Sequence, residues 1–256
     1  MNEVAMQRKL AVANWKMNGT IEKLQDIESL TKIHQQSQVG IVICPPATLI
    51  YQAVQITNNS NLQIGGQNCH YDTSGPYTGD ISADMLNNLG ARYVIIGHSE
   101  RRNSYDEQNE DVYARATAAI NCNLTVIVCV GETAKQKKQN ITLDVVVTQL
   151  KECIPNIQDA RQLVIAYEPV WAIGTGKIPT INQIHLVHSH MRKQLNKRFG
   201  SEIASQICLL YGGSVNPHNA TDIFAIPDLD GALVGNSSLF SQDFSSIIVA
   251  LESSKF

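Results

Sequence analysis

Short apolar segments recur along the chain, and eight of them in 256 residues give an average spacing of 32 residues. Several are continuous apolar runs, which is typical of parallel β-strands that are buried on both faces. The spacing leaves room for one strand and one helix in each repeat. The eight predicted strands span residues 10–13, 40–44, 62–64, 93–96, 124–130, 163–167, 207–211 and 231–234.

Helical patterns lie between these segments. Thr180 and Gln183 have the spacing of a capping box, so a helix is predicted to begin there. The apolar residues that follow at steps of three and four define one helix face: Ile181, Ile184, Val187, Met191 and Leu195. Gly200 is a natural end for this helix. Residues 106–120 and 142–153 are also predicted to be helical.

Eight strands that alternate with helices predict an α/β fold, a closed (β/α)₈ TIM barrel. An open, doubly wound parallel sheet is the main alternative. No linker rich in Pro, Gly or Ser and no shift in composition divides the chain. We therefore expect residues 1–256 to form a single barrel domain.

The composition narrows the class of protein. Hydrophobic residues make up 43% of the chain, which is enough for a large core and excludes disorder. The formal net charge of −3 comes without the basic face of a nucleic-acid-binding protein. No apolar stretch approaches the ~18 residues of a membrane helix, and the N-terminus lacks the apolar region of a secretory signal. We expect a cytoplasmic protein with no nucleic-acid or membrane partner.

Cysteine and histidine spacing predicts neither a metal site nor a redox site. None of the six cysteines forms a C-x-x-C pair. Three of them lie inside apolar runs and are predicted to be reduced, buried thiols: Cys44, Cys129 and Cys208. His185, His188 and His190 share a predicted helix that offers no fourth ligand, so we expect them on the helix surface. No cofactor motif is present.

Polar residues follow the ends of the predicted strands, where parallel α/β folds build their sites. Lys16 follows the first strand, His98 the fourth and Glu168 the sixth, and glycine loops follow the seventh and eighth. Each has an ordinary alternative interpretation: a surface cation, a structural imidazole, a solvated carboxylate, or turns. A barrel would bring all of them to one mouth, so the set indicates a functional site.

The chemistry of this set suggests a reaction on a phosphorylated carbon acid. Backbone N–H groups in glycine loops bind phosphate. Glu168 is a candidate base, and His98 and Lys16 could stabilise a developing oxyanion. Residues 169–179 have glycines in the middle and a proline at each end, which suits a lid. The Gly176-Lys177 pair is not part of a Walker phosphate loop, because Ile178 stands where that motif requires Ser or Thr.

At this point the chain resembles the triosephosphate isomerase family over essentially its whole length. The first segment that carries the resemblance is ANWKMNG at residues 13–19. The most specific segments are GHSERR at 97–102, AYEPVWAIGTGK at 166–177 and YGGSV at 211–215. GQNCH at 66–70 and YTGDISADML at 77–86 are also similar to the family.

The resemblance implies interconversion of dihydroxyacetone phosphate and D-glyceraldehyde 3-phosphate through an enediol(ate), in glycolysis and gluconeogenesis, without a cofactor or metal. Glu168 would remove a carbon-bound proton, a neutral His98 would polarise the carbonyl, and Lys16 would stabilise negative charge. Asn14 would help to position the substrate. Phosphate would be bound by backbone N–H groups at Gly174, Ser214, Gly235 and Asn236. Three residues match supporting positions: Glu100, Cys129 and Tyr211.

The resemblance also implies a homodimer in which the loop around Thr78 inserts beside the partner's site. The chain departs from the family pattern at three places, of which residues 105–107 (YDE) carry no assigned consequence. Asn236 stands where the family usually has glycine. Pro179 stands at the last lid position, which usually supplies an N–H to a tyrosine that corresponds to Tyr211, and proline has no N–H.

The sequence leaves two alternative functions open. The first is another phosphate-binding barrel enzyme of the aldolase or indole-pathway type. A Schiff-base lysine in the sixth strand would support it, but that strand leads to Glu168. The second is a non-catalytic barrel that serves as a scaffold. Loss of Lys16, His98 or Glu168 would support it, and all three are present.

Overall fold

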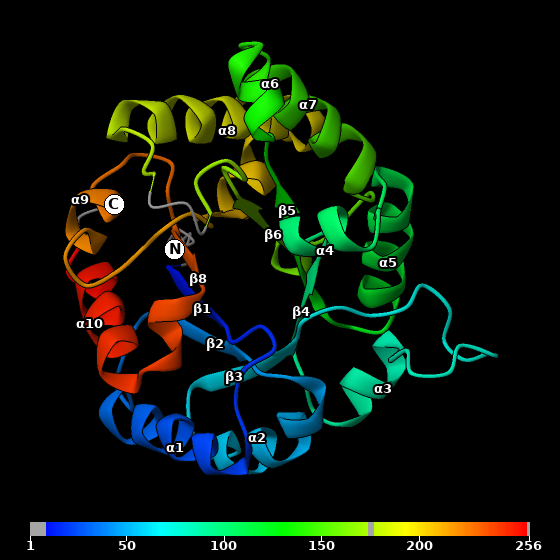
Figure 1. The fold of residues 1–256 in the computed structure, drawn as a ribbon, viewed down its shortest axis with the longest axis vertical. Helices are drawn as coiled ribbons and strands as arrows, with labels where there is room; N and C mark the ends of the chain where they lie inside the picture. Colours follow the sequence, from blue (N-terminus) through cyan, green and yellow to red (C-terminus); the bar gives the residue numbers. More distant parts are fainter. Residues whose placement is uncertain (1–8, 174–176, 255–256) are drawn as a thin grey trace, which may run out of the picture.

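The computed structural model describes residues 9–173 and 177–254. Eight parallel strands pair in sequence order, and β1 also pairs with β8, so the sheet closes on itself (Figure 1). The strands are β1 (Leu10–Asn14), β2 (Gly40–Cys44), β3 (Leu62–Gly66), β4 (Tyr93–Ile96), β5 (Thr125–Val130), β6 (Leu163–Tyr167), β7 (Cys208–Tyr211) and β8 (Gly231–Val234). The predicted (β/α)₈ barrel is confirmed, and the open sheet is excluded.

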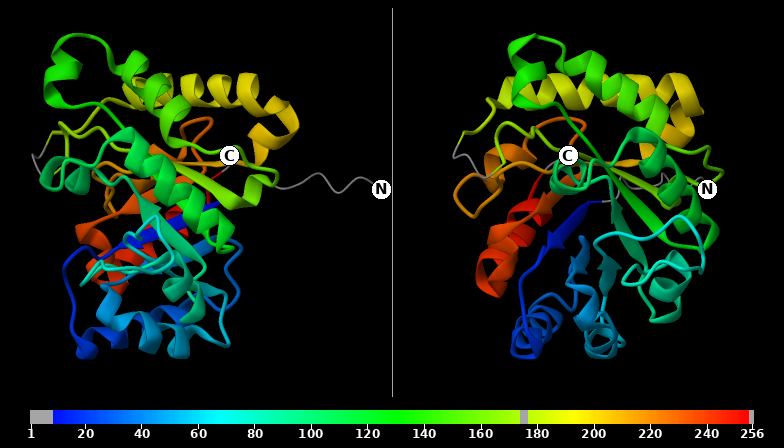
Figure 2. Two further views of the ribbon diagram at one scale, coloured as in Figure 1. Left: turned by 90° about the vertical axis from the view of Figure 1, so that its right-hand side faces the viewer. Right: turned by 45° about the vertical axis from the view of Figure 1, so that its right-hand side comes forward.

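Helices surround the barrel on its outer face, as both views in Figure 2 show. The α-helices are α1 (Leu24–Ile33), α2 (Ile50–Thr57), α3 (Ala83–Asn88), α4 (Ser99–Ser104), α5 (Asn109–Asn121), α6 (Ala134–Lys138), α7 (Thr142–Cys153), α8 (Ile181–Gln206), α9 (Ala220–Phe224) and α10 (Ser241–Glu252). Short 3₁₀ helices are η1 (Ile21–Lys23), η2 (Ala47–Leu49), η3 (Ala160–Gln162) and η4 (Asn236–Leu239).

The core has two layers, which explains why the strands read as continuous apolar runs. Alternate strand residues such as Val12, Ile95 and Leu210 fill the barrel interior. The residues between them, such as Ala11 and Val94, pack outward against the helices. Both faces of the strands are therefore buried along almost their whole length, with Gln63 of β3 exposed, so few polar residues are required. This packing holds the strand ends in place, and the polar loops that follow them are therefore held in place as well.

Helix α8 begins as predicted but is more complex than its sequence pattern. Thr180 caps it, and the capping box with Gln183 is formed. Gly200 has φ 79°, so it ends the regular helix as predicted, and a further helical segment then continues to Gln206. Ile181, which we placed on the apolar face, is the first residue of α8 and is 43% exposed. The other four residues of that face are buried.

Two local predictions need correction. The helix expected at residue 106 begins at Asn109, because Asp106 has φ 53° and Gln108 is the N-cap. The prediction that His188 lies on the helix surface is wrong. Its side chain is fully buried, with its ring edge-on to Tyr167, and Nδ1 lies 3.2 Å from the Asp228 carbonyl oxygen. Helix α8 packs against β7 and lies beside the Tyr167 ring of β6, so it can bury an imidazole there.

No α-helix in the described part of the chain is long and apolar enough to cross a membrane. All six cysteines are free thiols. Cys44, Cys129 and Cys208 are buried as predicted.

Candidate active site

A cavity of about 630 Å³ opens where the strands end. It brings together eight of the residues that the sequence singled out: Asn14, Lys16, His98, Glu100, Glu168, Ser214, Gly235 and Asn236. They come from the ends of five different strands, so only closure of the barrel places them side by side. Gly174 lies outside the described residues.

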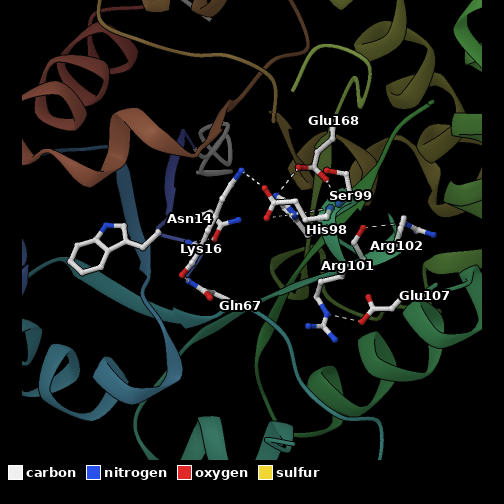
Figure 3. A network of polar contacts seen from close by, with 12 residues as sticks. Asn14, Lys16, Gln67, His98, Ser99, Arg101, Arg102, Glu107 and Glu168 are labelled. Atoms are coloured by element: carbon white, nitrogen blue, oxygen red, sulfur yellow. Dashed lines mark hydrogen bonds and ion pairs between the residues drawn. The ribbon is translucent and has the colours of Figure 1, made fainter. Parts of the chain in front are cut away.

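Glu168 follows β6 and is held on both carboxylate oxygens by the start of α4 (Figure 3). Oε1 lies 3.0 Å from Nε2 of His98. Oε2 accepts a hydrogen bond from the Ser99 backbone N–H at 2.8 Å. The Glu168 side chain is only 2% exposed. A buried carboxylate of this kind is stable only because it is paired and hydrogen-bonded.

The contacts of His98 define which of its nitrogens carries the proton. Nδ1 accepts a hydrogen bond from the Glu100 backbone N–H at 3.3 Å. A neutral ring therefore carries its proton on Nε2, which faces Glu168.

The two side chains also shift each other's pKa. Burial disfavours the charged imidazolium, but the Glu168 carboxylate outweighs burial and the pKa of His98 is raised. Burial likewise disfavours the Glu168 carboxylate. His98, the Ser99 N–H and Lys16 outweigh it, so the pKa of Glu168 is lowered. Glu168 is thus ionised when the site contains no substrate.

Lys16 is placed by an unusual backbone conformation. Its φ is 54°, in the left-handed region that side chains rarely adopt. Its ammonium group pairs with the Glu100 carboxylate. The Asn14 side chain accepts a hydrogen bond from the Lys16 N–H at 3.0 Å. Asn14 therefore supports Lys16 as well as lining the cavity.

The loops after β7 and β8 form part of the cavity wall, and the loop after β8 lies close to Lys16. Gly235, Asn236 and Ser214 all line the cavity. A Cβ on Gly235 would lie 3.4 Å from Cε of Lys16, so the ammonium-bearing chain runs close to this loop. Backbone N–H groups beside a lysine are well suited to an anion. Ser237, which the sequence analysis did not single out, also lines the cavity.

Cys129 and Tyr211 lie close to the site within the buried core. Burial raises the pKa of the Cys129 thiol, and the neighbouring Glu168 raises it further, so Cys129 is a neutral thiol. Burial also raises the pKa of Tyr211. The Tyr211 hydroxyl has no hydrogen-bond partner among the described residues. The backbone of Gly213 covers it so closely that a Cβ there would overlap it.

Several residues that shape the site were not among those predicted from the sequence. The Gln67 amide donates to backbone carbonyls of Lys16 and Cys44. A Cβ on Gly131 would overlap the Glu168 backbone, and one on Gly212 would lie 2.9 Å from Cγ of Glu168. The only sequence signal for Gln67 and Gly212 was that they lie in GQNCH and YGGSV, two of the segments that resemble the family. The contacts themselves join residues far apart in the chain.

Glu132 is a further buried carboxylate beside the site. Its side chain is completely buried. It accepts hydrogen bonds from the Tyr167 hydroxyl at 3.1 Å and from Nε1 of Trp171 at 2.7 Å. Lys137 lies over the Trp171 ring, 5.3 Å from its centroid. The beginning of segment 169–179 is therefore anchored to β5 and α6.

A second cavity of about 720 Å³ adjoins the first and shares Asn14, Lys16, His98 and Glu100 with it. The connection from β3 to α3 runs beside it and projects away from the barrel (Figure 1). No group of three His, Cys, Asp or Glu side chains suited to a metal ion occurs within residues 9–173 and 177–254.

Comparisons with known proteins agree with this geometry. A sequence model described as triosephosphate isomerase matches residues 9–251. The chain belongs to the triosephosphate isomerase family. It is 53% identical to the triosephosphate isomerase of Ruegeria pomeroyi over 247 residues, which cover 96% of this chain and 98% of the relative. It is 51% identical to that of Jannaschia sp. over 246 residues, covering 96% and 99%.

A solved structure supports the same family. The crystal structure of triosephosphate isomerase from Bartonella henselae superimposes with a TM-score of 0.89 at 43% identity, covering 95% of this chain and 98% of that one. Membership in the triosephosphate isomerase family makes the chain an isomerase of triose phosphates, an activity of glycolysis. The resemblance inferred from its motifs is thereby confirmed.

Proposed function

We propose that the chain interconverts dihydroxyacetone phosphate and D-glyceraldehyde 3-phosphate with Glu168 as base, His98 as electrophile and Lys16 as electrostatic stabiliser. The observation that carries this proposal is the 3.0 Å approach of Glu168 to Nε2 of His98 on one cavity wall. Lys16 lines the same cavity, beside the Gly235 loop. A substrate with its phosphate at that loop would extend its reacting carbons toward Glu168.

The reaction balances with these groups alone. Glu168 takes a proton from the carbon next to the carbonyl, and the C–H electron pair forms the C=C bond of the enediolate. The carbonyl π electrons move to oxygen, where the Nε2–H of His98 and the Lys16 ammonium stabilise the charge. Nε2 of His98 gives its proton to this oxygen and takes the proton of the hydroxyl on the first carbon, whose oxygen becomes the new carbonyl. The carboxyl group of Glu168 then returns its proton to the former carbonyl carbon. To begin, Glu168 must leave its contacts with Ser99 and His98.

The tautomer of His98 supports this role. The Glu100 N–H donates to Nδ1, which leaves the proton on Nε2 at the cavity. Substrate between His98 and Glu168 would interrupt their contact, which is the main cause that raises the pKa of His98. Burial would then favour the neutral ring, which polarises a carbonyl by hydrogen bonding.

Phosphate binding is assigned to backbone N–H groups at four positions: Gly174, Ser214, Gly235 and Asn236. Asn14 is assigned to substrate positioning through the loop that it shares with Lys16. Segment 169–179 would act as a lid that excludes water and suppresses loss of phosphate from the enediolate. Glu100, Cys129 and Tyr211 would have supporting roles.

We further propose that the chain is a homodimer. Large apolar and aromatic side chains are exposed around the second cavity and the projecting β3–α3 connection. Met17 is 96% exposed and Tyr105 is 69% exposed, and both line that cavity. Tyr71 and Tyr77 lie in the connection itself and are also exposed. A partner's connection around Thr78 would fill the cavity beside the site.

We also propose that the enzyme is located in the cytoplasm. All six cysteines are unpaired, which fits a reducing compartment and supports a cytoplasmic enzyme. We also propose that residues 1–256 form one domain, because the barrel requires strands from both ends of the described chain.

A coupled isomerase assay on the EDTA-treated protein tests the catalytic proposal. We expect activity with either triose phosphate. Glu168→Asp keeps the charge but withdraws the carboxylate by one methylene, and a misplacement of ~1 Å lowers the rate by ~10²-fold. An inactive wild-type protein, or an Asp variant with normal turnover, would overturn the assignment.

A further inference from the structure

Lys16 has a backbone conformation that requires support. A φ of 54° in a non-glycine residue is unfavourable and persists only when surrounding contacts determine it. Its N–H donates to Oδ1 of Asn14 at 3.0 Å. Its carbonyl accepts a hydrogen bond from Nε2 of Gln67 at 2.8 Å. The backbone N–H and the backbone carbonyl of Lys16 are therefore each held by a side chain.

Gln67 is placed to hold this peptide rigidly. It directly follows β3 and is half-buried. Its Nε2 atom also donates to the Cys44 carbonyl, at the end of β2, at 2.9 Å. A primary amide has two N–H bonds, and here each serves one carbonyl. Figure 3 shows Gln67 beside the Lys16 backbone, with its side chain directed away from Glu168.

The residue before Lys16 is also fixed. The Trp15 N–H donates to the Cys44 carbonyl at 3.1 Å, and its indole N–H donates to the Ser238 carbonyl at 3.2 Å. With Trp15 anchored, the Lys16 carbonyl is the group whose release would let the left-handed residue relax. Gln67 is its side-chain partner.

We infer that Gln67 is a positioning residue for the isomerisation, whose amide holds Lys16 in the left-handed conformation that presents its ammonium group beside Gly235. This inference rests on the proposed role of Lys16. Without the amide donors, φ of Lys16 can return to negative values, and the long side chain is then redirected. A shift of ~1 Å in a charged group at the site lowers the rate by ~10²-fold.

The first test compares Gln67→Met with wild type and with Gln63→Met. Gln63 lies on β3, the strand that Gln67 follows, and its exposed side chain makes the second variant a matched control. We expect Gln67→Met to lose ~10²-fold in kcat/KM, with a higher KM for triose phosphate and a melting temperature close to wild type. Gln63→Met should behave as wild type. Normal kcat/KM in folded Gln67→Met would overturn the inference.

A double-mutant cycle separates this inference from the proposed function. Lys16→Met should lose activity by itself, and normal activity there would count against the proposed function. If Gln67 acts through Lys16, adding Gln67→Met to Lys16→Met should cause little further loss. An equal further loss would show that Gln67 acts elsewhere, and the inference would fail while the role of Lys16 stood.

The Gln67→Glu variant supplies a signature that a merely structural role would not give. An ionised Glu offers no donor to the two carbonyls, whereas a protonated Glu offers one O–H. Activity of Gln67→Glu relative to wild type should therefore rise as the pH falls, and that of Gln67→Met should not. A flat ratio for both variants would contradict the hydrogen-bond mechanism.

Discussion

His98 and Glu168 are in direct contact, with Nε2 of the ring 3.0 Å from Oε1 of the carboxylate. The contact joins the loop after β4 to the end of β6 within a buried site. It raises the pKa of His98 and lowers that of Glu168. The two groups that the proposed reaction uses are thus coupled before substrate arrives.

The coupling predicts a change in the pH profile of a His98→Asn variant. We expect kcat/KM to fall by ~10²–10³-fold, as for the loss of one oxyanion donor. The acid limb of the remaining activity should move to higher pH, because burial raises the pKa of Glu168 once the imidazole no longer opposes it. A pH–rate profile measures this. An acid limb at the wild-type position would mean that the pair is not coupled in solution.

Gly212 gives a prediction about the position of the base. A Cβ there would lie 2.9 Å from Cγ of Glu168, and its backbone does not require glycine. Gly212→Ala should displace the carboxylate and reduce kcat/KM by ~10²-fold while the protein stays folded. Gly131→Ala is the contrasting variant, because its Cβ would overlap the Glu168 backbone and should destabilise the fold. Full activity in Gly212→Ala would contradict the observed packing.

Pro179 cannot donate a backbone hydrogen bond to the Tyr211 hydroxyl, so we expect this contact between lid and barrel to be missing. The Tyr211 hydroxyl is buried without a partner in the described residues, and proline at 179 has no N–H to donate. Tyr211→Phe should therefore change kcat/KM by less than about tenfold, since no hydrogen bond of ~0.5–1.5 kcal/mol is lost. Pro179→Ala should restore a donor and make the same tyrosine change harmful. A double-mutant cycle on kcat/KM measures the coupling.

If Tyr211→Phe alone loses more than about tenfold, some other group donates to the hydroxyl when substrate is bound. The free energy of unfolding gives an independent check. Removal of an unpaired buried hydroxyl should not lower it, so a strongly destabilised Tyr211→Phe would also contradict the observed environment.

His188 predicts acid sensitivity of the fold. Burial lowers its pKa from 6.5 to about 4, with Arg192 and His185 contributing in the same direction. Below pH 6.5 the unfolded chain binds a proton that the folded chain does not bind until about pH 4. The free energy of unfolding should therefore fall across this window, by about 3 kcal/mol from this residue.

Urea unfolding at pH 7.5 and pH 4.5 measures this effect. His188→Gln should lose less stability between the two pH values than wild type, because its side chain does not titrate. His218→Gln at an exposed histidine should follow wild type. Equal losses in all three proteins would exclude His188 as a cause of acid sensitivity.

The proposed dimer predicts the effect of a charge on the projecting connection. Thr78→Arg should weaken association, because a long charged side chain would be buried in the partner's cavity. Sedimentation equilibrium at micromolar concentration should then show monomers, with reduced activity. Thr148→Arg on the exposed face of α7 is the matched control. A wild-type protein that sediments only as a ~28 kDa species would exclude the dimer.

The sequence by itself determined the order and nature of the elements. Continuous apolar runs identified the strands, with four of the eight matching at both ends, because strands buried on both faces need few polar positions. The capping box at Thr180 and the glycine at 200 were local signals, and both were correct. Lys16, His98 and Glu168 were identifiable because each lies within two residues of the end of a strand.

Only the tertiary structure decided how those residues are supported. The contacts of Gln67 with Lys16, and of Ser99 with Glu168, join positions 51 and 69 residues apart. The burial of His188 depends on Tyr167 from another element. Periodicity records which face of an element is apolar, but a hydrogen bond across the barrel leaves no periodic trace. Closure of the barrel alone brings the strand ends, and therefore the chemistry, within a few ångströms.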